Sequence, residues 1–160
     1  MSNKILIAVD TSENAMKAVK YAAEQLGNES KVTLFHVFFK TPLLEFQEDE
    51  ILQHHYLSFS GSSKDFKDWL MTQKLAAEDS LDKAKNILIE AGLPPENIEI
   101  RIEERKTGVA ADILNKVKEG GYDTLIIGRR GMSRAKRFFT GSVTAKIMDH
   151  AQDCTVWIVV

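Results

Sequence analysis

The sequence predicts an α/β protein: a single domain built on an open, five-stranded parallel sheet with helices on both faces. Short apolar runs rich in branched residues alternate with helical segments along the chain, an order typical of parallel strands joined by right-handed crossovers. Several of these runs are continuously apolar, which indicates strands buried on both faces. The length of 160 residues fits one compact core.

The first part of the chain is expected to hold two strands with a helix between them. The apolar run at residues 4–9 predicts the first strand. Ser12 is expected to cap a helix that Gly27 stops. Residues 31–39 predict the second strand. Residues 40–66 follow no regular pattern and are expected to form an insertion or lid, because they are too few to build a core of their own.

The second part of the chain continues the alternation. Residues 67–91 predict a long helix, ended by Gly92 and the prolines after it. Isoleucines alternate with charged residues at 98–102, which predicts a strand with one buried face at a sheet edge. The remaining elements are expected to be a helix capped by Thr107, a strand at 123–128, a helix at 142–150 and a last strand at 154–160.

Composition and charge exclude some classes of function. The formal net charge of −2 gives no reason to expect nucleic acid or an anionic membrane as a partner. Cys154 is the single cysteine and cannot form an internal disulfide, and the apolar run near the N-terminus is shorter than a signal peptide requires. A reducing, cytoplasmic setting is therefore expected.

Two loops leave the carboxyl ends of predicted strands, where open α/β sheets bind ligands. The loop after the first strand carries Asp10. The loop after the fourth strand has the spacing G-x2-G-x9-G-S, from Gly128 through Gly131 to Gly141 and Ser142. Glycines let the backbone approach a bulky anion, and the N-terminus of the helix that follows carries a partial positive charge. This combination predicts a polyphosphate site.

This glycine motif, with its flanking residues, resembles the nucleotide-binding loop of the universal stress protein family, in the branch that binds ATP. The opening "KILIAVDTSENAMKAVKYA", the strand "VTLFHV" and the helix start "TGSVTAKIM" resemble the same family. The resemblance implies a Rossmann-like fold of the adenine nucleotide alpha hydrolase type, with strand order 3-2-1-4-5. It implies an ATP-binding regulatory or stress-response protein. Thr155 stands where the family usually has proline, far from the expected ligand site.

The resemblance also implies how the site residues divide among the parts of the nucleotide. Asp10 would hold the ribose hydroxyls, as suits an acceptor-only carboxylate. Mg²⁺ or Mn²⁺ is expected to bridge the phosphates, and no protein residue is assigned as a metal ligand. Arg129 and Arg130 are added as phosphate contacts from their charge alone. The resemblance places around the adenine Ala8, Val9, Val37 and Ile127, and around the phosphates Gly128, Gly131, Gly141, Ser142, Val143 and Thr144.

Each candidate residue also has a structural interpretation. Asp10 could cap the first helix, the glycines could serve turns with positive φ, and His36 is expected to be a hydrogen-bonded core histidine. The pair His54 and His55 lacks any recognisable metal-ligand spacing. Arg134, Lys136 and Arg137 are expected to form a solvated basic face.

No catalytic residue is expected. The sequence shows neither a nucleophile beside a base nor the lysine of a P-loop, so we expect nucleotide binding without efficient turnover. Two alternatives stay open: a slow ATPase or autophosphorylating enzyme, and a nucleotide-free interaction module. The apolar last strand, together with the family resemblance, predicts a homodimer through residues 155–160.

Overall fold

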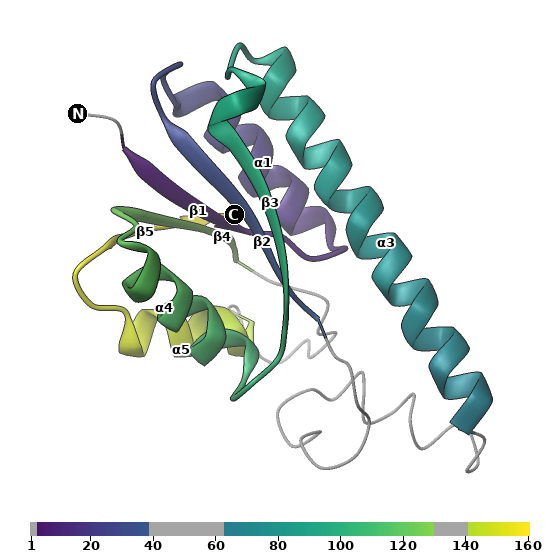
Figure 1. The fold of residues 1–160 in the computed structure, drawn as a ribbon. Coiled ribbons are helices and arrows are strands. Elements are labelled where there is room, and N and C mark those ends of the chain that lie inside the picture. The colour runs from purple at the N-terminus through teal and green to yellow at the C-terminus, as the bar shows by residue number, and fades with distance from the viewer. Residues whose placement is uncertain (1–2, 39–62, 130–140) are drawn as a thin grey trace.

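The computed structural model describes residues 3–38, 63–129 and 141–160, and its sheet confirms the predicted fold (Figure 1). Five strands, all parallel to their neighbours, lie in the order β3-β2-β1-β4-β5. Strand boundaries differ from the expected ones by one or two residues, as is usual for element ends. The strands are β1 (Lys4–Ala8), β2 (Lys31–Phe38), β3 (Ile98–Glu104), β4 (Thr124–Gly128) and β5 (Thr155–Val159).

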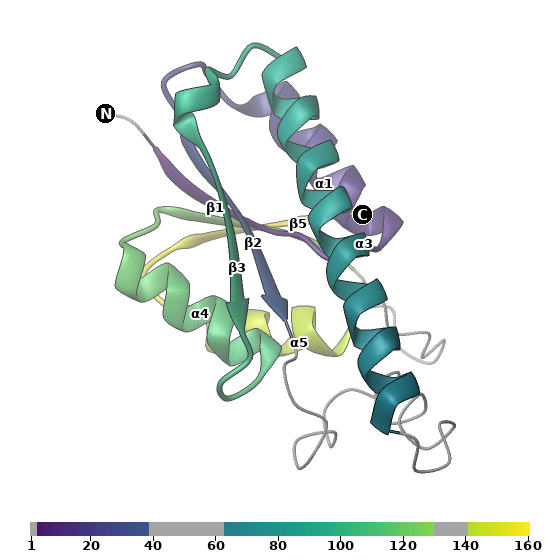
Figure 2. The same ribbon diagram turned by 45° about the vertical axis from the view of Figure 1, so that its right-hand side comes forward.

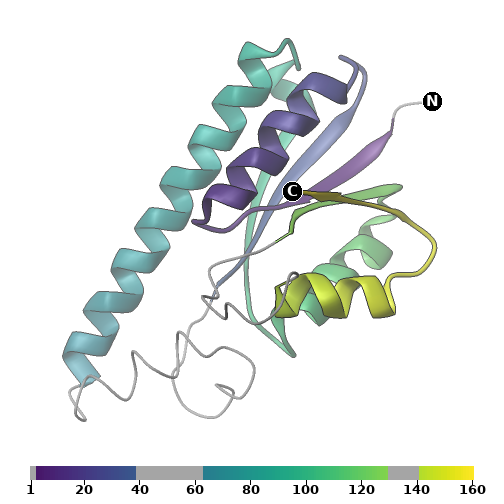
Figure 3. The ribbon, with the colours of Figure 1, turned by 180° about the vertical axis from the view of Figure 1, so that it is seen from behind.

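Helices cover both faces of the sheet, as predicted. One face carries α1 (Glu13–Gln25) and α3 (Ser63–Glu90), and the other carries α4 (Val109–Gly120) and α5 (Ser142–His150) (Figures 1 and 3). A short 3-10 helix, η2 (Pro95–Asn97), precedes β3. Figure 2 shows α3 running past the carboxyl ends of the strands.

The alternation of side chains along β1 builds one core on each face. Ile5 and Ile7 are buried under α1 and α3, whereas Leu6 is buried under α4 and α5. Successive side chains of a strand point to opposite faces, so a continuously apolar strand needs a cover on each side. This explains why the apolar runs correctly predicted a sheet with two helical layers.

Helix α1 begins as predicted and ends by a different mechanism. The Ser12 side chain accepts a hydrogen bond from the Ala15 N–H, at 3.2 Å, and so caps the helix. At the other end, Leu26 takes an extended backbone conformation as the C-cap. Gly27 is not in the left-handed conformation, so the expectation that this glycine stops the helix by its conformation is wrong.

Helix α3 begins at Ser63, before the expected residue 67. The last residues of the predicted irregular segment 40–66 are therefore helical, and Phe66 and Leu70, one turn apart, are both buried. The end of the helix is as predicted: Gly92 has a φ of 103°, and its N–H and that of the next residue bond back to the last turn. Residues 39–62 lie outside the described part of the chain.

The prediction that Thr107 caps α4 is wrong. The N-cap is Gly108, which has no side chain to accept a bond. The buried Asp112 carboxylate accepts hydrogen bonds from the N–H groups of Lys106 and Thr107, at 2.8 and 3.1 Å. A carboxylate inside the first turns of a helix is favourable there because of the helix dipole, and in this case it also holds the preceding loop.

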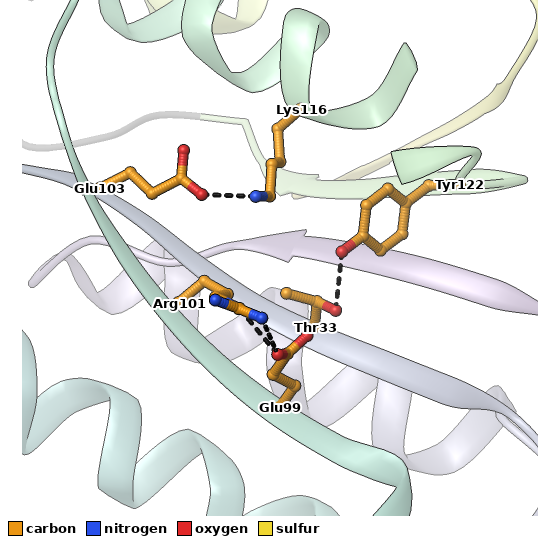
Figure 4. A network of polar contacts seen from close by, with 6 residues as sticks. All are labelled: Thr33, Glu99, Arg101, Glu103, Lys116 and Tyr122. Atoms are coloured by element: carbon orange, nitrogen blue, oxygen red, sulfur yellow. Dashed lines mark hydrogen bonds and ion pairs between the residues drawn. The ribbon is translucent and has the colours of Figure 1, made fainter. Parts of the chain in front are cut away.

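Polar contacts on the β3 side of the sheet are of two kinds (Figure 4). In the core, the Tyr122 hydroxyl donates to Thr33 Oγ1 at 2.9 Å, which satisfies two buried polar groups. Nearer the surface, Glu99 pairs with Arg101, and Glu103 pairs with Lys116 of α4. The charged side chains on β3 make this edge of the sheet unsuited to pairing with another strand.

Candidate functional site

The carboxyl ends of β1 and β4 lie side by side at the centre of the sheet. These two strands are paired from Ile5↔Thr124 to Ile7↔Ile126, and the chain continues from β1 toward β2 on one side and from β4 toward β5 on the other. The strand order therefore reverses between them, which is where open α/β sheets bind ligands. Asp10 and Gly128, predicted as site residues from opposite ends of the chain, stand at these two strand ends.

Asp10 belongs to a tight hydrogen-bonded turn between β1 and α1. Its Oδ1 accepts the N–H of Ser12 at 2.8 Å. The alternative that Asp10 itself caps α1 is wrong, because the N-cap is Ser12. The second carboxylate oxygen, Oδ2, takes no part in the bond to Ser12. The turn thus fixes the carboxylate by one oxygen. Within residues 3–38, 63–129 and 141–160, no hydrogen bond occupies the other.

His36 holds the residue before Asp10. The β1–β2 ladder ends at Ala8↔Phe35, and beyond it the Val9 N–H still donates to the Phe35 carbonyl at 2.9 Å. The Val9 carbonyl oxygen lies 2.8 Å from Nδ1 of His36. Because a carbonyl oxygen only accepts, the His36 ring must carry its hydrogen on Nδ1.

Burial favours the neutral form of the His36 ring. Burial lowers the pKa of the imidazole below its ordinary 6.5, although the Val9 carbonyl and the negative charge of Asp10 both act to raise it. The structure thus confirms the expected hydrogen bond of His36, on a residue that is half-buried and lies at the margin of the core. The acceptor of this hydrogen bond is a backbone carbonyl of the candidate site, that of Val9.

Gly128 is required by packing rather than by backbone conformation. A Cβ atom there would lie 2.7 Å from the Asn14 carbonyl oxygen and 2.8 Å from its carbon. The left-handed glycines of the described residues are Gly92 and Gly121, so positive φ does not explain Gly128 or Gly141. The missing side chain lets the first turn of α1 lie directly against the end of β4. Asn14, half-buried at this contact, had no signal in the sequence.

Helix α5 presents an open N-terminus beside Gly128. Gly141 is the N-cap, and the first helical hydrogen bond runs from the Ala145 N–H to the Gly141 carbonyl, at 2.9 Å. The N–H groups of Ser142, Val143 and Thr144 therefore have no acceptor within the helix. The first turn carries no acidic residue. Such a terminus is suited to an anion.

Three further hydrogen bonds fix α5 against the sheet. The Thr144 side chain is buried and its hydroxyl donates to the Gly128 carbonyl at 3.1 Å. The Gly141 N–H donates to the Arg129 carbonyl, and the Arg129 N–H donates to the Val159 carbonyl, at 3.0 and 2.8 Å. The Gly141 N–H and the Thr144 hydroxyl hydrogen are thus engaged inside the protein, whereas the N–H groups of Ser142 and Val143 have no acceptor among the described residues.

The apolar candidates divide between the two faces of the sheet. Ala8, Val37 and Ile127 come from three adjacent strands and pack with the core under α4 and α5. Val9 packs with the opposite core, under α1 and α3. The structure therefore brings three of the four predicted side chains together, and it leaves Val9 to contribute through its backbone.

Some predicted residues lie outside the described part of the chain. These are Arg130 and Gly131 of the site, the basic residues Arg134, Lys136 and Arg137, and the pair His54 and His55. Within the described ranges, no group of three or more His, Cys, Asp and Glu side chains could hold a metal ion. No helix in those same ranges is long and apolar enough to cross a membrane.

Comparison with known proteins identifies the family. The chain matches the Universal stress protein family over residues 1–160, so it belongs to that family. It is 29% identical to universal stress protein YxiE of Bacillus subtilis, over 99% of both chains. It is 30% identical to universal stress protein Sll1388 of Synechocystis, over 98% of this chain and 96% of that protein.

Solved structures of the family share the fold. Universal stress protein UspA from Lactobacillus plantarum superposes with a TM-score of 0.69 at 21% identity, covering 99% of this chain and 97% of that one. A family member from Arabidopsis thaliana with AMP bound gives 0.63 at 21% identity, covering 98% and 90%. The universal stress protein from Archaeoglobus fulgidus in complex with dAMP gives 0.59 at 19% identity, covering 100% and 98%.

The contact at Gly128 predicts a difference between two glycine substitutions. Gly128→Ala should lower the free energy of unfolding by about 1–3 kcal/mol, because its Cβ would overlap the Asn14 backbone. Gly27→Ala is the matched control, since a Cβ there meets nothing within 4 Å, and it should be neutral or stabilising by up to about 1 kcal/mol. Urea denaturation measures both, and equal stability of the two variants would contradict the packing role of Gly128.

The half-buried His36 predicts a pH dependence of stability. Because the folded-state pKa lies below 6.5, the unfolded chain takes up the proton first, so the free energy of unfolding should fall as pH drops below about 6.5. His36→Asn cannot ionise and should lose this part of the fall. His150→Asn, which leaves His36 in place, should retain it. Chemical denaturation between about pH 7.5 and about pH 5.5 tests this, and identical slopes for all three proteins would refute it.

Proposed function

We propose that this protein binds ATP, or a related adenine nucleotide, at the carboxyl ends of β1 and β4 and acts as a nucleotide-dependent regulatory protein in a stress response. One observation carries the proposal: the N-terminus of α5 lies beside Gly128, and Asp10 follows the end of the neighbouring strand β1. An anion-binding terminus and a carboxylate at one strand switch point suit a ligand with both phosphates and a diol.

The phosphates would be bound mainly by backbone N–H groups. Those of Ser142 and Val143 are the best donors, because they lie in the first turn of α5 and have no acceptor in the helix. Gly128 and Gly141 keep side chains away from the ligand, and Thr144 positions the Gly128 carbonyl. Gly131 and the cationic Arg129 and Arg130 complete the proposed phosphate site. Mg²⁺ or Mn²⁺ would be held by the phosphates rather than by protein carboxylates.

The nucleoside would lie over the ends of β1, β2 and β4. Asp10 offers Oδ2 to the ribose hydroxyls, since Oδ1 is bonded to Ser12. The adenine would contact Ala8, Val37 and Ile127, together with backbone groups of Val9. The relatives bound to AMP and dAMP support adenine as the base.

Binding rather than turnover is the proposed activity. The histidine nearest to Asp10 in the described structure is His36, and its Nδ1–H is donated to Val9. A ligand that binds only the folded state adds a stability that grows with its concentration over Kd. The protein would thus report nucleotide level through its own conformation, in the cytoplasmic setting that its single cysteine favours.

Replacement of Ser142 by proline tests the phosphate site with little expected change in fold. Ser142 is the first residue of α5, where proline is well tolerated, and Gly141 before it has the extended backbone that proline requires. Ser142→Pro removes one phosphate-binding N–H and should weaken Mg-ATP binding by about tenfold or more. Isothermal titration of nucleotide-free protein measures the loss.

Ser142→Ala is the control, because it removes the hydroxyl and keeps the N–H. Its affinity for ATP should stay within a few-fold of the wild type. Wild-type affinity in Ser142→Pro, with an unchanged melting temperature, would exclude α5 as the phosphate site. Absence of saturable binding by the folded wild-type protein would refute the proposed function as a whole.

We also propose that two copies pair through β5, the apolar edge of the sheet. The Thr155 N–H and the Val159 carbonyl bond toward β4, so the backbone groups of Val156 and Ile158 face the open edge. Light scattering at micromolar concentration should give the mass of a dimer. Ile158→Pro removes an edge N–H that β4 does not use and should give a folded monomer. A monomeric wild type would refute this assembly.

A further inference from the structure

The hydrogen bond between His36 and Val9 links the core to the proposed sugar site. His36 lies two residues after Leu34 on β2, so its side chain leaves the sheet on the face covered by α1 and α3. Its ring nevertheless reaches the Val9 carbonyl of the neighbouring strand, at 2.8 Å. The contact joins the two strands just beyond Ala8↔Phe35, the last pair of the β1–β2 ladder.

Both the N–H and the carbonyl of Val9 are therefore hydrogen-bonded to β2. Its N–H donates to the Phe35 carbonyl at 2.9 Å and its carbonyl accepts from the His36 ring. With both peptide groups of Val9 fixed, the direction in which Asp10 leaves β1 is fixed as well. Asp10 then closes its own turn on the Ser12 N–H, at 2.8 Å. The orientation of Oδ2 depends on this whole series of bonds.

We propose that His36 is the positioning residue of the sugar site: by holding the Val9 carbonyl it orients the Asp10 carboxylate toward the 2′ and 3′ hydroxyls of a ribonucleotide. The proposal rests on the proposed function, and it specifies the sugar as the part of the nucleotide whose binding depends on this contact. His36 acts through Asp10 and does not touch the nucleotide. Its loss should thus affect nucleotides with sugar hydroxyls and spare those without them.

The chemistry of the ring is suited to this role. In the neutral form with hydrogen on Nδ1, His36 places no positive charge beside Asp10, whereas a cation there would compete with the ribose hydroxyls for the carboxylate. Burial keeps the ring in that form by lowering its pKa. A side chain of similar shape without a donor leaves the Val9 carbonyl unbound, and a shorter amide supplies a donor near the Nδ1 position.

The test compares Mg-ATP with Mg-2′,3′-dideoxyATP, which lacks both sugar hydroxyls, by isothermal titration. Wild-type protein should bind ATP more tightly by roughly tenfold or more, the effect of one charge-assisted hydrogen bond. His36→Phe should lose most of this preference while its affinity for the dideoxy nucleotide stays unchanged. His36→Asn should keep the preference. In an Asp10→Ala background, His36→Phe should have no further effect on ATP.

Leu34→Val is the matched control, since Leu34 is buried on the same face of the same strand and makes no hydrogen bond to Val9. It should lower stability and keep the preference for ATP. An undiminished preference in His36→Phe, with Asp10→Ala losing it, would overturn the proposal. A preference lost equally in Leu34→Val and His36→Phe would also overturn it, because general loosening of the core would then be the cause.

A second measurement does not depend on nucleotide binding. In ligand-free protein, amide exchange by NMR should be faster at Ser12 in His36→Phe than in His36→Asn, because the Asp10 turn loses its support. Equal exchange rates would overturn the positioning role. If the wild type bound no nucleotide, the proposed function would fail together with the sugar site, and the Ser12 exchange rate would still show whether His36 positions this turn.

Discussion

The close contact between Gly128 and the first turn of α1 is the constraint on which the rest of this structure depends. Because Gly128 has no side chain, the Asn14 backbone lies within the space that a Cβ would fill. The Gly128 carbonyl oxygen also accepts a hydrogen bond from the Thr144 hydroxyl. A single position without a side chain thus brings together the ends of β1 and β4 and the first turns of α1 and α5. A side chain there would move the Asp10 carboxylate away from the N-terminus of α5.

The fold could be predicted from the sequence because its signals are local. Continuous apolar runs required two covering layers, and the Ser12 cap and Gly92 were recognisable by residue type. The start of α3 at Ser63 was missed because the polar residues before Phe66 resemble a loop. The Thr107 cap was wrong because Asp112, five residues later, provides the oxygens for that turn.

The contacts among the candidate site residues could not be predicted from the sequence. Motif spacing pointed to Gly128, but the reason for that glycine is a neighbour far away in sequence, Asn14, which no local pattern can indicate. His36 was correctly expected to be hydrogen-bonded, although it is only half-buried. Its partner, the Val9 carbonyl, exists only because β1 and β2 end their ladder at that level. Residue types alone do not predict long-range pairing of this kind.

The hydrogen bond from Gly141 to Arg129 has a consequence for how the length of this chain can vary. It joins the two ends of the segment between β4 and α5, while Arg129 is itself fixed to the end of β5. With both ends held by the domain, a longer or shorter segment between them changes mainly the closure entropy, at about 0.6 kcal/mol for each doubling of length. Insertions and deletions between residues 129 and 141 can therefore be accommodated without displacing either the sheet or the helix. The domain thus offers a fixed frame for a segment of variable length between β4 and α5.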